Sequence, residues 1–86
     1  MPSDTKALDP EDVRVGATIR ALREAYGLER AELATAIGKS EQLVGFIERG
    51  ERRATPPVCR DIAKTLGIPL AAITVKDYEQ LRKAGS

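Results

Sequence analysis

The chain contains no histidine and no tryptophan, and its aromatic side chains are limited to one phenylalanine and two tyrosines. Without histidine, the sequence lacks the residue that most often serves as a general base or a metal ligand in proteins. It also lacks a glycine-rich phosphate-binding loop and any cluster with metal-ligand spacing. We therefore expect no enzyme, no bound metal and no cofactor, and a core built from aliphatic side chains.

Cysteine and long apolar segments are equally scarce. Cys59 is the only cysteine, so no disulfide can form within the chain, and a reducing, bacterial cytoplasmic setting is expected. No apolar run approaches the roughly 20 residues of a membrane span, and residues 1–9 show no signal-peptide pattern. Cys59 is predicted to be a small buried residue near a helix start, with a redox sensor as the alternative.

The charges that are present are unevenly distributed over 86 residues, a length that suits one small domain. Residues 1–13 carry one basic and four acidic side chains, whereas residues 14–60 carry nine basic and six acidic ones. A basic excess in the middle of the chain suits a nucleic-acid partner, but an ordinary mixed-charge surface gives the same count. Charge alone leaves both interpretations open.

Two short amphipathic patterns meet at a glycine in that basic segment. Residues 30–37 and 41–49 each show helical spacing, Gly38 can take the positive φ of a tight turn, and Ser40 can cap the second helix. The predicted inward side chains are Leu33, Ala34, Ile37, Val44, Ile47 and Glu48. The opposite face of the second helix, turned to solvent or to a ligand, carries Gln42, Gly45, Phe46 and Arg49. This spacing is that of a helix-turn-helix, whose second helix enters the DNA major groove.

A longer helix is predicted before this pair. Asp9 is a good N-cap, Pro10 suits the first helical position, and the helix then runs to about Tyr26 and stops at Gly27. Its apolar stripe is Val15, Ile19 and Leu22, and Tyr26 could extend it. The following helix begins after Glu29, a weaker cap than serine, threonine or asparagine.

Two further helices are predicted after the pair. Thr55 is the expected N-cap of a fourth helix that ends at Gly67, and residues 69–73 form a short fifth helix. Residues 74–84 are either one more amphipathic segment or a frayed end. The expected division of the chain is a disordered segment at 1–9, a helix-turn-helix domain at 10–75, and a tail or short helix at 76–86.

These motifs, taken together, give the chain a clear resemblance. Residues 15–73 resemble the phage-repressor (Cro/C1) type of helix-turn-helix protein, the XRE class of bacterial and phage regulators. The matching motifs are Ile19-Arg20-Ala21-Leu22-Arg23, Tyr26-Gly27-Leu28, Glu32-Leu33-Ala34, Gly38-Lys39-Ser40, Ile47-Glu48-Arg49-Gly50 and Ile62-Ala63-Lys64-Thr65-Leu66-Gly67-Ile68.

The resemblance implies an all-α, five-helix, lambda-repressor-like domain that binds double-stranded DNA sequence-specifically and frequently forms homodimers. It implies that Arg30, Arg52 and Arg53 contact DNA phosphates, and it pairs Arg23 with Glu48. The pair has a physical reason, because Glu48 lies on the inward face and a buried carboxylate needs a partner. Further phosphate contacts are predicted for Lys39, Ser40 and Arg49.

The outward face of the predicted recognition helix departs from the family's usual polar pattern. Gln42 is its one conventional base reader, able to bridge N6 and N7 of adenine. Glu41 could accept a hydrogen bond from cytosine N4, or simply favour the helix N-terminus. Gly45 could permit close approach to DNA, at a cost to the helix of about 1 kcal/mol relative to alanine. With Phe46, these residues make up the predicted base-reading set.

Two functions remain open at this point. The first is a DNA-binding transcriptional regulator, expected to be a repressor, that places helix 41–49 in the major groove. The second is a protein-interaction module on the same fold, such as an antitoxin, a phage-encoded inhibitor or a cofactor of another regulator. In that case Leu43 and Phe46 would dock a protein partner instead of contacting thymine methyl groups.

Overall fold

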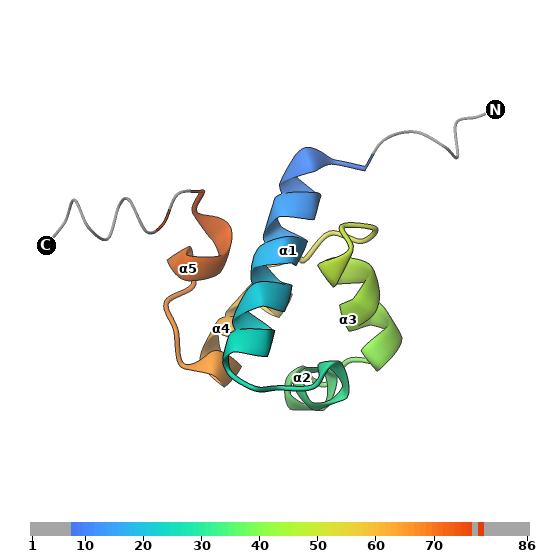
Figure 1. Cartoon of the computed structure of the whole chain (residues 1–86), viewed down its shortest axis with the longest axis vertical. Coiled ribbons are helices and arrows are strands. Elements are labelled where there is room, and N and C mark those ends of the chain that lie inside the picture. Colours follow the sequence, from blue (N-terminus) through green and yellow to red (C-terminus); the bar gives the residue numbers. More distant parts are fainter. Residues whose placement is uncertain (1–7, 77, 79–86) are drawn as a thin grey trace, which may run out of the picture.

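The computed structural model describes residues 8–76 and residue 78, and the regular structure in this part of the chain is helical. Its helices are α1 (Pro10–Ala25), α2 (Arg30–Ile37), α3 (Glu41–Glu48), α4 (Pro56–Leu66) and α5 (Ala71–Thr74). Figure 1 shows α1 in the centre, with α3 on one side, α5 on the other and α2 at its C-terminal end. The all-α, five-helix prediction is therefore confirmed.

The core is aliphatic, as the scarcity of aromatic residues predicted. Each helix contributes one of the largest fully buried side chains, which are Ile19, Leu33, Val44, Ile62 and Ile73. Burying such a side chain stabilises the fold by about 1.5–3 kcal/mol relative to leaving it exposed. Because α5 has only four residues, the burial of Ile73 against α1 and α4 holds this short helix in place.

Local capping defines the helix starts much as the sequence indicated. The Asp9 carboxylate accepts a hydrogen bond from the Glu11 backbone N–H at 2.8 Å, and the Ser40 hydroxyl accepts one from the Leu43 N–H at 3.0 Å. Gly38 ends α2 in the left-handed conformation, with φ of 71°. The left-handed conformation costs glycine little free energy and other residues more. The local sequence therefore determines the turn between α2 and α3.

Some local predictions need correction. Thr55 precedes α4 but makes no side-chain cap hydrogen bond. The start of α2, in contrast, is better capped than predicted. There the Glu29 backbone N–H donates to the Glu32 carboxylate at 2.7 Å, half of a reciprocal capping arrangement. Tyr26 is 53% exposed and does not extend the apolar stripe of α1, because α1 ends one residue before it.

The short fifth helix lies one to two residues later than predicted. It runs from Ala71 to Thr74, and Leu70 occupies its N-cap position without a side-chain cap. The predictions for segment 1–9, for 74–84 and for tail 76–86 fall largely on residues 1–7, 77 and 79–86, outside the described residues. Within residues 8–76 and 78, no helix combines the length and the apolar character needed to cross a membrane.

Two glycines bring α1 close to the end of α3, which the sequence analysis did not foresee. A Cβ added at Gly16 would lie 2.1 Å from the backbone oxygen of Ile47. A Cβ at Gly50 would lie 2.7 Å from a methyl carbon of Val13. The absence of these side chains therefore lets α1 pack directly on the last turn of α3, which positions the outer face of α3.

We predict that Gly16→Ala destabilises the domain by about 3 kcal/mol, the upper end of the usual cost of overpacking. The obstacle is backbone, which cannot move without shifting α1 from α3. The free energy of unfolding is measured by urea denaturation followed by circular dichroism. The matched control is Gly45→Ala, where the nearest atom is the end of the Arg49 side chain at 3.1 Å. Equal destabilisation by both substitutions would contradict the close helix contact.

Candidate nucleic-acid interface

The first turn of α3 presents two polar side chains to solvent. Glu41 and Gln42 are both exposed, directly after the turn formed by Gly38, Lys39 and Ser40. Glu41 lies at the positive end of the α3 dipole, where a carboxylate is favoured. Leu43 is only half-buried and packs against the core, so less of it reaches the outer face than a docking residue would need.

An open pocket on the outer side of α3 brings together six of the predicted site residues. They are Arg30, Glu41, Gln42, Gly45, Phe46 and Arg49. Gly45 departs from the prediction, because it is buried and not open to solvent. The Arg49 guanidinium covers it on one side and the aliphatic part of Arg30 on another. Gly45 is therefore the floor of the pocket.

Phe46 supports two arginines from the C-terminal side of α3. The guanidinium carbon of Arg49 lies 5.5 Å from the centre of the Phe46 ring, and that of Arg52 lies 6.0 Å from it. Both distances are within the range of cation–π attraction, worth about 0.5–1 kcal/mol at exposed sites. The Arg49 Nε also donates to the Glu51 carboxylate at 3.2 Å. The sequence analysis did not predict this group of contacts.

The remaining predicted phosphate contacts are distributed around this pocket and beyond it. Lys39 and Ser40 are exposed in the turn before α3, and Arg52 is exposed in the loop after it. Arg53 is also exposed but lines a different cavity, between α1, α4 and α5, beside Cys59. The structure thus groups Arg52 with Phe46 on α3, whereas Arg53 lines a separate cavity.

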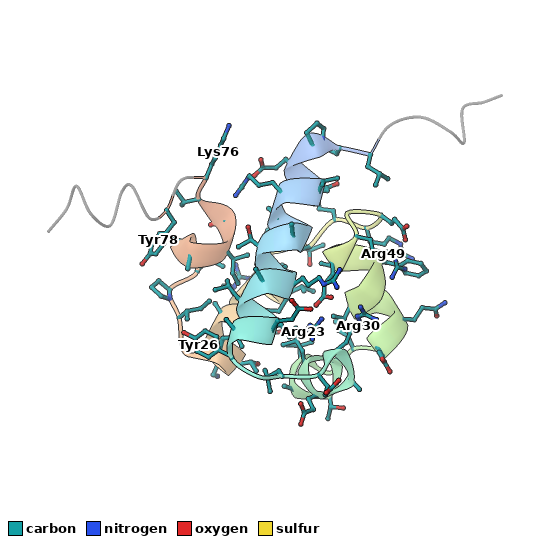
Figure 2. All side chains as sticks on the ribbon, in the orientation of Figure 1. Arg23, Tyr26, Arg30, Arg49, Lys76 and Tyr78 are labelled. Atoms are coloured by element: carbon teal, nitrogen blue, oxygen red, sulfur yellow. The ribbon has the colours of Figure 1, made fainter. Side chains whose placement is uncertain are left out.

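A buried ion pair lies behind the outer face, as predicted for Arg23 and Glu48. The Arg23 Nε and Nη2 donate to the two oxygens of the Glu48 carboxylate at 2.6 and 3.1 Å, and Nη1 donates to the Leu28 carbonyl at 2.7 Å. Figure 2 shows Arg23 in the space between α1 and α3. The hydrogen bond to Glu48 raises the pKa of Arg23, despite the opposing effect of burial.

Glu48 has a second arginine partner that the sequence analysis missed. The Arg30 Nε lies 3.4 Å from a Glu48 oxygen, and the Arg30 side chain remains 36% exposed. Glu48 itself is almost fully buried, with 1% of its side chain exposed. The same carboxylate therefore holds one arginine in the core and a second at the edge of the outer pocket. The inward position of Glu48 in the sequence pattern was the only signal for this role.

Cys59 is buried near the start of α4, as predicted, and its thiol donates to the Ala54 carbonyl at 3.5 Å. Burial raises the pKa of the Cys59 thiol, and the smaller effect of Arg53 opposes it. A raised pKa keeps the thiol in its less reactive protonated form, which disfavours the redox alternative. In residues 8–76 and 78, no three histidine, cysteine or acidic side chains gather as a metal site would require.

We predict that Glu48→Ala destabilises the domain by about 3–5 kcal/mol, because it leaves the Arg23 guanidinium buried without its carboxylate. Glu24→Ala is the matched control, since that carboxylate is exposed and lies 3.8 Å from the same guanidinium. An exposed ion pair contributes about 0–1 kcal/mol. The free energy of unfolding of both variants is measured by thermal and urea denaturation. A similar loss of stability in the two variants would show that Glu48 has no special role in holding the fold together.

Comparison with known proteins identifies the same unit. Residues 19–73 match the family described as helix-turn-helix. The chain is 38% identical over 68 residues to an uncharacterised transcriptional regulator in the ATPase CF(0) region of Rhodospirillum rubrum, a match that covers 79% of this chain and 63% of the relative. It is 39% identical over 54 residues to an uncharacterised HTH-type transcriptional regulator of Mycobacterium tuberculosis, covering 63% of this chain and 21% of the relative. The chain thus spans less than two thirds of the length of either relative.

A solved structure agrees with these matches. The restriction-modification controller protein C.AhdI from Aeromonas hydrophila superposes with a TM-score of 0.72 at 31% identity, over 76% of this chain and 98% of that one. The match of residues 19–73 covers the helices described above, including the turn between α2 and α3. The chain therefore belongs to the helix-turn-helix family, in its Cro/C1-type branch.

Proposed function

We propose that this protein binds double-stranded DNA sequence-specifically and regulates transcription, with α3 in the major groove. The observation that carries the proposal is the outer pocket of α3, where exposed polar side chains and arginines surround a glycine floor. The α2–turn–α3 unit behind it has the geometry by which such helices enter DNA. The named relatives are described as transcriptional regulators, which supports the same assignment.

Phosphate contacts would position the domain on the duplex. Arg30 at the start of α2 lines the pocket on the outer face of α3, and Lys39 and Ser40 directly precede this helix. Arg52 lies against the ring of Phe46, at 6.0 Å from its centre. Arginine and lysine side chains, together with backbone N–H groups at helix starts, are the usual partners of phosphate oxygens. Arg53 is the weaker candidate, because it lines the cavity beside Cys59.

Base contacts would come from the first turn of α3. Gln42 is exposed there and can present its amide to N6 and N7 of adenine. Glu41 stands beside it, and its carboxylate can accept from cytosine N4 in addition to favouring the helix N-terminus. Such contacts would supply sequence preference on top of the nonspecific binding through phosphates.

We propose that the regulation is repression. We also propose that the protein acts in the bacterial cytoplasm, where the chromosome lies. A domain bound in the major groove over a promoter blocks the polymerase from the same DNA. The alternative, docking of a protein partner through Leu43 and Phe46, receives less support. Leu43 packs partly into the core, and Phe46 has two arginines against its ring.

We also propose that the protein acts as a homodimer. At about 1.5 Å per residue the eight residues of α3 span about 12 Å, or about four base pairs of groove. A single copy therefore reads a short half-site, and two copies related by a two-fold axis would read a palindrome.

Selection from a random DNA pool should yield palindromic sites with half-site centres about 10 base pairs apart. Native mass spectrometry of the selected complex should find two chains per duplex. One chain per duplex at saturation, on an asymmetric site, would contradict the homodimer while leaving DNA binding in place. A failure to select any sequence at moderate salt would contradict the regulator itself.

Gln42→Ala and Arg52→Ala should weaken binding in different ways. Gln42→Ala should cost about 1–3 kcal/mol at one base pair only. Arg52→Ala should weaken binding to all sequences equally, and it should make the slope of log K against log salt shallower by about 1. Fluorescence anisotropy titrations over a range of salt measure both effects.

The matched control for these titrations is Arg60→Ala, which removes the same charge from the exposed side of α4. It should leave both the base preference and the salt slope unchanged. An Arg60→Ala effect as large as that of Arg52→Ala would show that net charge, and not the face of α3, determines binding.

A further inference from the structure

We propose that Arg49 reads a guanine, and that Gly45 and Phe46 position its guanidinium for this contact. The inference rests on the proposed DNA binding and deepens it by naming a base and the residue that recognises it. It departs from the sequence-based assignment of Arg49 to the phosphate backbone.

Arg49 folds back along α3 and does not extend beyond its end. Its Nη1 atom lies 3.1 Å from the position that a Cβ on Gly45 would occupy, one helical turn earlier. Side chains on helices point back toward the N-terminus, and the missing side chain of Gly45 leaves room for the guanidinium there. Figure 2 shows Arg49 on the side of α3 that faces away from α1. The guanidinium therefore lies on the outer face, among the base-reading candidates.

Two neighbours hold the guanidinium in this position. The ring of Phe46 lies beneath it at 5.5 Å, and the Glu51 carboxylate accepts from its Nε at 3.2 Å. A planar, supported guanidinium loses less conformational freedom on binding than a free one. Phe46 then acts as a platform for arginine, which differs from both roles that the sequence suggested for it.

The donors that remain on Arg49 fit guanine. Glu51 occupies Nε, and within residues 8–76 and 78 it is the only carboxylate paired with Arg49. The Nη1 and Nη2 amino groups form a parallel pair of donors, which matches the O6 and N7 acceptors of guanine in the major groove. Methionine, which has an unbranched side chain without N–H donors, cannot make this contact.

The position also predicts where the guanine should be. Gly45 lies three residues after Gln42, which is about 4.5 Å along the helix axis at 1.5 Å per residue. Successive base pairs are about 3.4 Å apart. The guanine is therefore expected one or two base pairs from the pair that Gln42 reads.

The test is selection from a random DNA pool, using the full chain as wild type, Arg49→Met, Gly45→Leu and Arg52→Met. The wild type should select a guanine near the Gln42 position, with about 5- to 150-fold preference over the other bases, the range of a good bidentate contact. Arg49→Met removes the donors and should lose this preference while still binding DNA. Gly45→Leu fills the space that Arg49 occupies and should lose the same preference.

Arg52→Met is the matched control, since it removes the same charge and Arg52 contacts the same ring from the loop. It should change the affinity for all sequences alike and keep the guanine preference. Circular dichroism establishes that each variant is folded. If Gly45→Leu fails to fold, Arg49→Met alone tests the proposal.

Several outcomes would overturn the inference. Retention of the guanine preference in Arg49→Met, with weaker binding to all sequences, would return Arg49 to the phosphate backbone. Selected sites that contain no preferred guanine would exclude the contact while leaving the regulator proposal standing. A wild-type protein that selects no sequence would overturn both proposals together.

Discussion

The rest of the structure depends on the ion pairs and hydrogen bonds of one carboxylate, that of Glu48. It lies at the C-terminal end of α3, where the helix dipole disfavours a negative charge, and it is almost completely buried. Arg23 offsets both costs with two hydrogen bonds, and also donates to the Leu28 carbonyl in the turn before α2. One guanidinium therefore joins α1, the turn after it and α3. Removing either charge would leave the other buried without its partner.

The same carboxylate links the core to the outer surface. Its contact with Arg30 at 3.4 Å directs a partly exposed arginine toward the pocket of α3. On the far side of the pocket, Phe46 and Glu51 hold Arg49 in a comparable way. Arginines that are already ordered need less reorganisation when they meet a ligand, so the proposed DNA contact would require little rearrangement of these side chains.

The candidate site was only partly predictable from the sequence. Helical spacing placed Gln42 and Glu41 on an outward face, and the structure finds both exposed. The same spacing predicted that Gly45 is exposed to solvent, but side chains from two elements cover it. Spacing also left Leu43 available for a partner, although it packs partly into the core. Periodicity gives the direction in which a residue points, and says nothing of how far a neighbouring long side chain reaches over it.

The sequence by itself determined the elements that depend on near neighbours. The cap at Ser40 and the left-handed turn at Gly38 follow from contacts within four residues, so they could be read directly. Only the tertiary structure decided that Gly16 must be a glycine and that Arg30 shares Glu48 with the core pair. Both depend on the separation and rotation of helix axes, which arise when distant segments pack. No local pattern of residues encodes that geometry.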